Sequence, residues 1–311
     1  MASDDKTFVV YFQSWSEKWS DDPTKLQLAN IASYANMVIV SFMKPDATYE
    51  GNTKLAGTGL DFSADGVVVK DAIAYLKSKN PDTKVLVAVG GATYQNFAAL
   101  NTQALADVVR DFGFDGVDID YEPFNNGQCS SSNGQITCTT DAEYLRIVNE
   151  IRQALPVPYL VTVAAWSVGA YGEGEWADAK PKAALTGLLL NLLRSPEAGH
   201  IDQLNVMSYD ASPEYDPKVA LAAYQNYFKG NIVMGVEVPP EAWGGHIYTI
   251  PEVRNLSQAV IDLNAAGMML WSLQKQPNGT PSDTNPNAQM IAQAICETLL
   301  LGDCQLPLFE A

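Results

Sequence analysis

The chain has 311 residues, 47% of them hydrophobic and 18% charged, a composition that suits one large globular domain over residues 1–311. Acidic residues outnumber basic residues 36 to 19, which gives a net charge of −17. Such a charge argues against nucleic acid and anionic membranes as partners. It is compatible with a neutral or cationic polymer as substrate, but simple solubility is the preferred explanation.

Eight short apolar runs recur along the chain, and each is typical of a parallel strand buried on both faces. They are residues 7–15, 36–43, 84–91, 114–122, 158–166, 203–210, 231–238 and 268–273. Helical spacing or helix-start residues predict helices at 22–34, 64–79, 97–112, 141–155, 182–194, 218–228, 256–266 and 287–301. Residues 123–140 are rich in Asn, Gly and Ser and are predicted to form a loop.

Eight strand–helix units predict an α/β fold, a single-domain (β/α)₈ TIM barrel. A doubly wound open sheet is the alternative, but no G-x-G-x-x-G follows the first strand. In a barrel, function collects at the carboxyl ends of the strands. Aromatic and acidic residues dominate those ends here, which suits the apolar faces and hydroxyl rims of sugar rings. They include Tyr11, Trp15, Asp120, Glu122, Trp166, Tyr209, Asp210, Glu237 and Trp271.

The fourth strand carries a row of acids in the stretch F-D-G-V-D-I-D-Y-E, residues 114–122. Asp118, Asp120 and Glu122 alternate with apolar residues, so they share one face of the strand. Burial and mutual repulsion let one such acid hold its proton near neutral pH, as general acid catalysis on glycosidic bonds requires. A metal site or a solvated acidic edge is the alternative. Asp115 has the other parity and is predicted to be a structural hydrogen-bonding group.

The run from Asp115 to Glu122 resembles the D-x-x-D-x-D-x-E signature of glycoside hydrolase family 18, which includes chitinases and endo-β-N-acetylglucosaminidases. The family's M-x-Y-D motif is similar to the run from Met207 to Asp210, and its eighth-strand tryptophan to Trp271.

The resemblance departs from the family pattern at two places. The family's S-x-G-G motif on the third strand reads A-V-G-G here, so Ala88 replaces the serine before Gly90 and Gly91. In addition, only about thirty residues separate the seventh and eighth strands. The chain therefore resembles the subfamily that lacks the small α+β insertion domain.

The resemblance implies a retaining mechanism in which the substrate's own acetamido group attacks, without metal or cofactor. Glu122 is then the general acid, Asp120 orients the acetamido N–H, and Asp118 shares a proton with Asp120. Tyr209 donates its hydroxyl to the acetamido group. Substrate-binding roles fall to Tyr11, Gly91, Met207, Asp210, Trp271 and Trp166, and structural roles to Gly90 and Asp115.

The resemblance further implies an endo-acting chitinase that acts on chitin or chito-oligosaccharides, and we expect a monomer. An endo-β-N-acetylglucosaminidase for N-glycan cores is one alternative. A carbohydrate-binding lectin with an inactive site is the other, but such relatives usually lose the final glutamate, which this chain keeps as Glu122.

Four cysteines occur, but no C-x-x-C and only two histidines, so we expect no zinc site. Three disulfide pairings and four free thiols all remain open from the count alone. The close pairs Cys129/Cys138 and Cys296/Cys304 each close a short loop, and these are the disulfides that we predict. Disulfides indicate a secreted, extracellular protein. No apolar run reaches the roughly 18 residues of a transmembrane helix.

Overall fold

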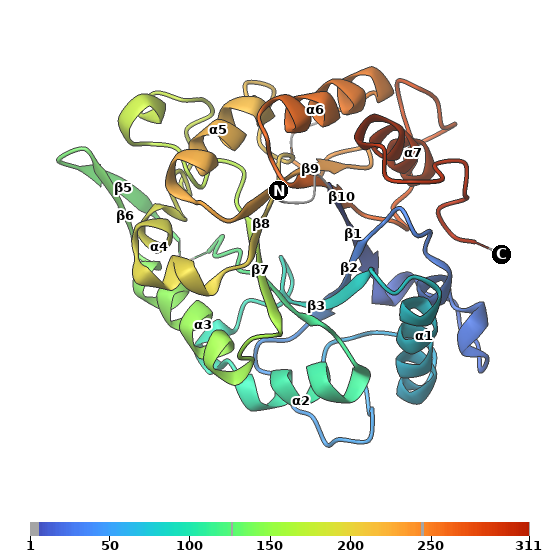
Figure 1. Cartoon of the computed structure of the whole chain (residues 1–311). Helices are drawn as coiled ribbons and strands as arrows, with labels where there is room; N and C mark the ends of the chain where they lie inside the picture. The colour runs from blue at the N-terminus through green and yellow to red at the C-terminus, as the bar shows by residue number, and fades with distance from the viewer. Residues whose placement is uncertain (1–5, 126, 244–245, 311) are drawn as a thin grey trace.

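Eight parallel strands form a closed barrel in the computed structural model, which describes residues 6–125, 127–243 and 246–310 (Figure 1). Their order around the barrel is β1-β10-β9-β8-β7-β4-β3-β2. This confirms the predicted (β/α)₈ barrel. The bounds are β1 Thr7–Gln13, β2 Met37–Met43, β3 Lys84–Gly90, β4 Gly116–Asp120, β7 Leu160–Ala165, β8 Gln203–Val206, β9 Asn231–Glu237 and β10 Gly267–Trp271.

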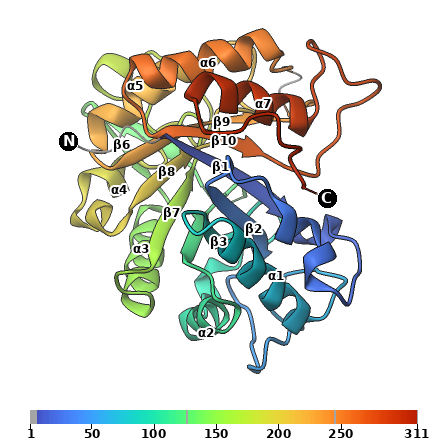
Figure 2. The ribbon, with the colours of Figure 1, turned by 45° about the vertical axis from the view of Figure 1, so that its right-hand side comes forward.

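Seven α-helices surround the barrel in the described part of the chain, and their buried faces cover the outer side of the strands (Figure 1). The helices α6 and α7 lie side by side outside β9 and β10 (Figure 2). Among the described residues, α6 is the only helix or strand between β9 and β10. The bounds are α1 Gly66–Lys79, α2 Thr102–Phe112, α3 Asp141–Ala154, α4 Leu190–Arg194, α5 Pro217–Tyr227, α6 Ile250–Asp262 and α7 Ala288–Leu299.

The interior of the barrel is partly polar beneath its carboxyl-terminal mouth. Asp118 of β4 lies opposite Ala88 of β3 on one side and Thr162 of β7 on the other. All three residues are buried. Val117 and Ile119, which alternate with Asp118 along β4, are also buried but lie on the opposite face of the strand. The register therefore directs the acid row inward and the apolar residues toward the helices.

The prediction of a helix at 22–34 is wrong. Two short 3₁₀ turns, Pro23–Lys25 and Gln27–Asn30, occupy this segment. The buried carboxylate of Glu17 accepts hydrogen bonds from the backbone N–H groups of Gln27 at 3.1 Å and Leu28 at 3.0 Å. These donors are then not available to an α-helical ladder, which needs bonds to the carbonyl four residues earlier. A side chain ten residues away thus overrides the local helix signal.

The helix predicted at 182–194 forms only in its last turn, as α4. Backbone donors before it bind a neighbouring segment instead: Gly187 N–H to Val168 O and Leu189 N–H to Gly169 O, each at 3.0 Å. Gly187 also has a φ of +85°, which interrupts a right-handed helix. The predicted helix at 97–112 begins late, at α2, because Asn101 caps it by accepting from the Ala104 N–H at 3.1 Å.

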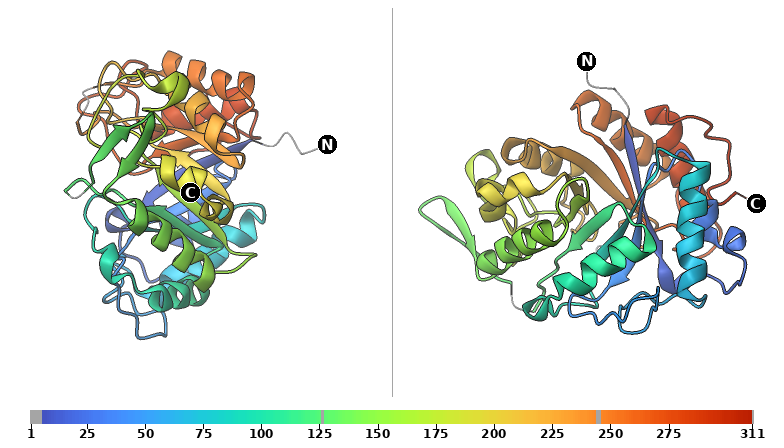
Figure 3. Two further views of the ribbon diagram at one scale, coloured as in Figure 1. Left: turned by 90° about the vertical axis from the view of Figure 1, so that its left-hand side faces the viewer. Right: turned by 60° about the horizontal axis from the view of Figure 1, so that its bottom comes forward.

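Residues 123–140 contain a β-hairpin that the loop prediction missed. The strands β5 Cys129–Ser132 and β6 Gln135–Cys138 are antiparallel, and they extend away from the barrel wall (Figures 1 and 3). Asn133 and Gly134 form the turn with φ of +52° and +78°. An Asn-Gly pair with two positive φ angles is the favoured two-residue hairpin turn.

Two disulfides join Cys129 to Cys138 and Cys296 to Cys304, as predicted. The first links a facing pair across the β5–β6 hairpin. The second ties the end of α7 to the segment that follows it. Across the residues that the structure describes, no helix has the length and apolar character needed to cross a membrane.

Candidate active site

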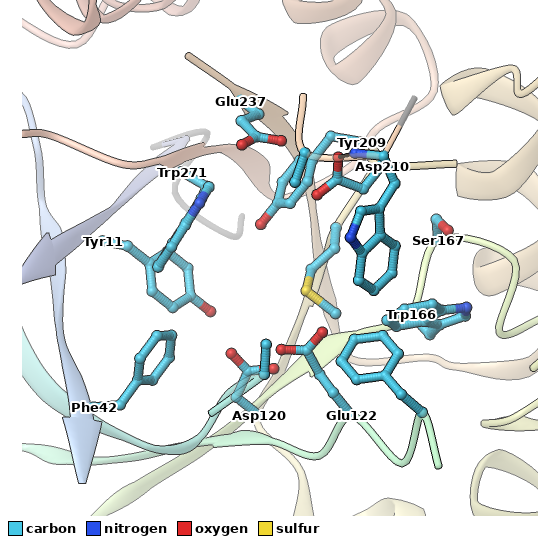
Figure 4. Close-up of a pocket in the computed structure, with 15 residues that line it drawn as sticks. Tyr11, Phe42, Asp120, Glu122, Trp166, Ser167, Tyr209, Asp210, Glu237 and Trp271 are labelled. Carbon is cyan, nitrogen blue, oxygen red and sulfur yellow. Dashed lines mark hydrogen bonds between the residues drawn. The ribbon is translucent and has the colours of Figure 1, made fainter. Parts of the chain in front are cut away.

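A pocket of about 240 Å³ opens at the carboxyl-terminal mouth of the barrel (Figure 4). Eight of the residues given a site role from the sequence line it, which brings together side chains from the ends of five strands. They are Tyr11, Asp120, Glu122, Trp166, Met207, Tyr209, Asp210 and Trp271.

Asp118 lies beneath the pocket and is held by three donors. The hydroxyl of Tyr11 donates to Oδ2 at 2.7 Å, and the hydroxyl of Thr162 donates to Oδ1 at 2.6 Å. The Asn205 side-chain amide donates to Oδ1 at 2.9 Å. Burial raises the pKa of Asp118, while these hydrogen bonds to its charged form lower it. These three donors fix the position of Asp118, and the proton that it is expected to share with Asp120 stays a prediction.

Asp120 is the last residue of β4 and is 4% exposed. Its Oδ1 is buried and has no hydrogen-bond partner within the part of the chain that the structure describes. Burial, and then the charges of Glu122 and Asp118, raise its pKa well above the ordinary range. A buried, unpaired carboxyl oxygen is unfavourable unless a ligand supplies the missing partner, so this atom is placed to receive a donor from a bound molecule.

Glu122 follows β4 by two residues, and its carboxyl group points into the pocket beside that of Asp120 (Figure 4). Burial and then the nearby charge of Asp210 raise its pKa to about 7. A carboxyl group with such a pKa holds its proton through much of the neutral range, so it can serve as a general acid there.

Tyr209 and Asp210 lie on the opposite side of the pocket from Asp120 and Glu122 (Figure 4). Asp210 has a φ of +53°, and two contacts hold this geometry. Its N–H donates to Glu241 Oε2 at 2.9 Å, and its Oδ1 accepts from the Trp243 N–H at 2.9 Å. Burial and then the charge of Glu237 raise the pKa of Tyr209 well above its ordinary value, so its hydroxyl stays a donor.

Aromatic rings flank the acids on two sides. On one side, Trp271 stacks on Phe42 at 5.6 Å between ring centroids, and Phe42 stacks on the exposed Trp15 at 6.0 Å. On the other side, Trp166 packs edge-on against Phe124 at 5.2 Å. Because sugar rings stack on such flat faces, the arrangement offers binding surface on both sides of Glu122.

The paired glycines serve packing of the barrel mouth. At Gly90, with a φ of +109°, a Cβ would lie 2.1 Å from the Asp120 carbonyl oxygen. At Gly91, with a φ of +76°, a Cβ would lie 2.9 Å from the Phe42 ring. Gly91 lies outside the pocket lining, whereas Ala92 is part of it. The substrate-binding role of Gly91 stays a prediction, and the structure places this residue against Phe42, which lines the pocket.

Asp115 lies outside the pocket, on the parity opposite to the acid row. One oxygen accepts from Lys77 Nζ at 2.8 Å and the other from the Val85 N–H at 2.8 Å. These bonds tie the start of β4 to α1 and β3.

Several lining or supporting residues were not assigned to the site from sequence. Phe124 and Trp243 lie in loops, where no periodic pattern points to a site, and Thr162 and Asn205 sit in apolar strands. Glu237 was noted only as an acidic strand end. A polar residue inside an otherwise apolar strand is the one signal that would have found Thr162 and Asn205. The additional lining residues are Phe42, Ala92, Phe124, Ser167, Glu237, Ala242 and Trp243.

Solved structures of similar fold include chitinases and a binding protein. A chitinase of Ostrinia furnacalis in complex with allosamidin matches with a TM-score of 0.62 at 17% identity, over 95% of this chain and 99% of that one. The chitinase of Rhizomucor miehei gives 0.57 at 16%, over 94% and 100%. Human YKL-39, described as a pseudo-chitinase with retained chitooligosaccharide binding properties, gives 0.64 at 14%, over 94% and 99%.

Sequence relatives point the same way. A chitinase of Plasmodium falciparum is 30% identical over 147 residues, which are 43% of this chain and 37% of that protein. Chitinase A1 of Niallia circulans is 26% identical over 192 residues, 52% of this chain and 25% of that protein. The chain thus spans less than half the length of these relatives. The family profile of glycosyl hydrolases family 18 matches residues 7–298. With the match extending from β1 to α7, the chain belongs to glycosyl hydrolases family 18.

Proposed function

We propose that this barrel is the single catalytic unit of an endo-acting chitinase, which hydrolyses β-1,4 bonds between N-acetylglucosamine units with retention. The observation that carries the proposal is that Glu122, whose pKa is about 7, lies beside the buried Asp120, whose Oδ1 lacks a partner among the residues that the structure describes. The first group is suited to give a proton, and the second is suited to receive the N–H of an acetamido group.

In the first step, Glu122 gives its proton to the glycosidic oxygen as the bond from that oxygen to the anomeric carbon breaks. The carbonyl oxygen of the sugar's own acetamido group bonds to the anomeric carbon, forming an oxazolinium ion. Asp120 accepts the acetamido N–H and stabilises the positive charge, while Tyr209 donates to the acetamido oxygen. No protein nucleophile is needed, as in the substrate-assisted exceptions to the two-carboxylate scheme.

In the second step, Glu122, now ionised, takes a proton from a water molecule that attacks the anomeric carbon. The bond to the acetamido oxygen breaks and the acetamido group is restored. Two displacements at one carbon give net retention, and Glu122 regains its proton.

Binding surfaces on both sides of the acids support endo action. Trp271, Phe42 and Trp15 extend from the pocket on one side, and Trp166 and Phe124 lie on the other. A chain bound across the mouth would therefore place sugar units on both sides of the cleaved bond.

The two disulfides support a secreted, extracellular protein. We also propose that it acts as a monomer on chitin or chito-oligosaccharides.

The test compares product formation from a series of chito-oligosaccharides and from a glycoprotein. We expect internal cleavage of the oligosaccharides with the β-anomer formed first, no release of N-glycans, and inhibition by a thiazoline analogue of the oxazolinium ion. Release of N-glycans would favour an endo-β-N-acetylglucosaminidase. Binding without turnover would favour a lectin like the pseudo-chitinase of similar fold.

Glu122→Gln provides the variant for the same test. The amide has nearly the same shape but no proton to give, so we expect hydrolysis to fall by at least about 10²–10⁴-fold while oligosaccharide binding is retained. A variant within a few-fold of the wild-type rate would remove Glu122 from the acid role.

A further inference from the structure

Glu237 lines the pocket but has no part in the mechanism proposed above. It is the last residue of β9, lies opposite Trp271 in the sheet register, and is 2% exposed. Its carboxyl group points into the pocket next to Trp271 and Tyr209 (Figure 4). A buried acid at this position faces whatever molecule rests on the Trp271 ring.

Only one oxygen of Glu237 is satisfied by the protein. Oε1 forms an ion pair with Lys275 Nζ, which also donates to the Pro240 carbonyl at 2.6 Å. Oε2 is buried without a hydrogen-bond partner among the described residues. Buried polar atoms are seldom left unpaired, because the lost hydration is not repaid. The ion pair therefore accounts for one oxygen of this carboxyl group, and Oε2 is left without a partner among the described residues.

The electrostatic setting of Glu237 favours a neutral partner. Burial raises its pKa to about 8, with further contributions from the charges of Asp210 and Glu241, although Lys275 acts in the opposite direction. The group therefore exists in both protonated and ionised forms near neutral pH. A hydroxyl group fits both forms, since it accepts from the acid and donates to the carboxylate. An ammonium group would fit only the ionised form.

The position of Glu237 selects one hydroxyl of the sugar. Asp120 and Glu237 lie on opposite sides of the pocket (Figure 4). If the acetamido group on C2 points toward Asp120, the opposite edge of the pyranose ring points toward Glu237. That edge carries C5 and its hydroxymethyl group, because C2 and C5 lie across the ring from each other.

We propose that Oε2 of Glu237 binds the 6-hydroxyl of the sugar that stacks on Trp271, and so makes this site specific for a 6-hydroxylated unit. The inference rests on the proposed function, which places N-acetylglucosamine on Trp271. A site built around a hydrogen bond to a substrate hydroxyl rejects the analogue that lacks it, because the buried partner is then left unpaired.

The test measures kcat/KM on the N-acetylglucosamine tetrasaccharide and on its 6-deoxy counterpart, for the wild type and for Glu237→Ala. We expect the wild type to prefer the hydroxylated substrate by about 10- to 100-fold, the range for a hydrogen bond to a charged group. Glu237→Ala should lose most of this preference, chiefly by slowing the hydroxylated substrate.

Lys275→Met is the matched control, since it breaks the same ion pair but keeps the Glu237 carboxyl group. We expect this variant to retain most of the preference for the 6-hydroxyl. If Glu237 serves only the ion pair, Glu237→Ala and Lys275→Met will behave alike and will slow both substrates by the same factor, which would overturn the inference. A wild-type preference below about twofold would overturn it too, whether or not either variant folds.

Failure of the inference and failure of the proposed function are distinguishable. Calorimetric binding of both tetrasaccharides to Glu122→Gln reports on Glu237 without turnover. Hydrolysis with equal use of the two substrates would reject the inference and leave the proposed function intact. Absence of hydrolysis in the wild type, together with a binding preference for the 6-hydroxyl, would reject the proposed function and leave the inference about Glu237 intact.

Discussion

Thr162 supplies a hydroxyl to Asp118 from the strand next to the acid row. On the other side of Asp118, the register places Ala88, which has no hydroxyl. The serine expected from the family pattern at position 88 is thus absent, but Thr162 Oγ1 donates to Asp118 at 2.6 Å. Together with Tyr11 and Asn205, it keeps the carboxylate in one orientation beneath Asp120.

Thr162→Val is expected to lower kcat about 10-fold with a smaller change in KM, because a hydrogen bond to the charged Asp118 is lost without a change of shape. Thr58→Val is the control, since Thr58 is equally buried but its hydroxyl bonds to backbone groups, donating to the Leu55 carbonyl and accepting from the Leu60 N–H. We further expect Ala88→Ser to restore part of the activity in the Thr162→Val background. Equal effects of the two valine substitutions on kcat would contradict a positioning role for Thr162.

The raised pKa of Glu122 makes folding stability depend on pH. Its pKa rises from an ordinary value of 4.5 to about 7 on folding, so the folded state binds the proton more tightly than the unfolded state. This contribution to stability is fully present below pH 4.5 and is lost as the pH rises through about 7. The raised pKa that suits Glu122 for the proposed catalysis thus lowers the free energy of unfolding at alkaline pH.

Glu122→Gln removes this titration. We expect its free energy of unfolding, relative to the wild type, to increase by up to about 3 kcal/mol between pH 4.5 and pH 8. Urea unfolding of both proteins across this range measures the difference. Parallel pH dependences of the two proteins would show that Glu122 has an ordinary pKa in the folded state.

The β5–β6 hairpin is fastened to the barrel by more than its disulfide. The Ile136 N–H donates to Glu173 Oε1 at 2.6 Å, and the Arg194 guanidinium donates to the Ile136 carbonyl at 3.1 Å. The Ile136 side chain packs closely against Gly172 and Gly187. The hairpin therefore keeps contacts with the barrel that do not depend on Cys129 and Cys138.

Replacing Cys129 and Cys138 together by serine should lower the free energy of unfolding by about 2–3 kcal/mol, the value for closing a loop of this length in the unfolded chain. Because the remaining contacts hold the hairpin and neither cysteine lines the pocket, we expect kcat to change less than about twofold. Denaturant unfolding and initial rates measure the two effects. A large loss of activity in the folded variant would show that the disulfide positions the active-site loop.

The net charge of −17 acts at the scale of the whole molecule. It attracts polycations over a distance set by ionic strength, about 10 Å at 0.1 M salt and 3 Å at 1 M. The proposed chemistry, by contrast, depends on an acetamido group that fully deacetylated chitosan lacks. This polymer should therefore bind to the protein without being hydrolysed.

We expect fully deacetylated chitosan to bind at low salt, to be released at 1 M salt, and to remain uncleaved throughout. The acetylated oligosaccharides are the control, and their KM should vary little with salt because they are neutral. Co-sedimentation and product analysis measure the two properties. Hydrolysis of deacetylated chitosan at a rate comparable to chitin would require a protein nucleophile and would contradict the substrate-assisted mechanism.

Local sequence patterns were sufficient for the barrel and for the face shared by the acid row. Strand alternation alone places Asp118, Asp120 and Glu122 on one side, and eight apolar runs with intervening helices allow few other folds. The Asn133-Gly134 turn was also readable, because an Asn-Gly pair is the favoured two-residue hairpin turn, although the Cys-Ser-Ser-Ser run before it has little strand propensity. The loop prediction overlooked that signal.

The failures arose where a distant group competes with local structure. Glu17 takes backbone donors from the segment predicted as a helix at 22–34, and the Val168 and Gly169 carbonyls take those of residues 187 and 189. The local sequence of the affected segment does not reveal either contact, because each depends on a residue that only folding brings close.

The sequence by itself determined the order of strands and helices that makes the barrel and predicted the two short-range disulfides, since both depend on spacing along the chain, and its motifs resembled those of the family. Only the tertiary structure decided which donors hold Asp118, that Phe42 lines the pocket, and that Glu237 Oε2 is buried with no partner in the described part of the chain. The reason is that burial and hydrogen-bond pairing are set by groups that lie on other strands. A pKa or an unpaired oxygen therefore becomes definite only once the barrel has closed around it.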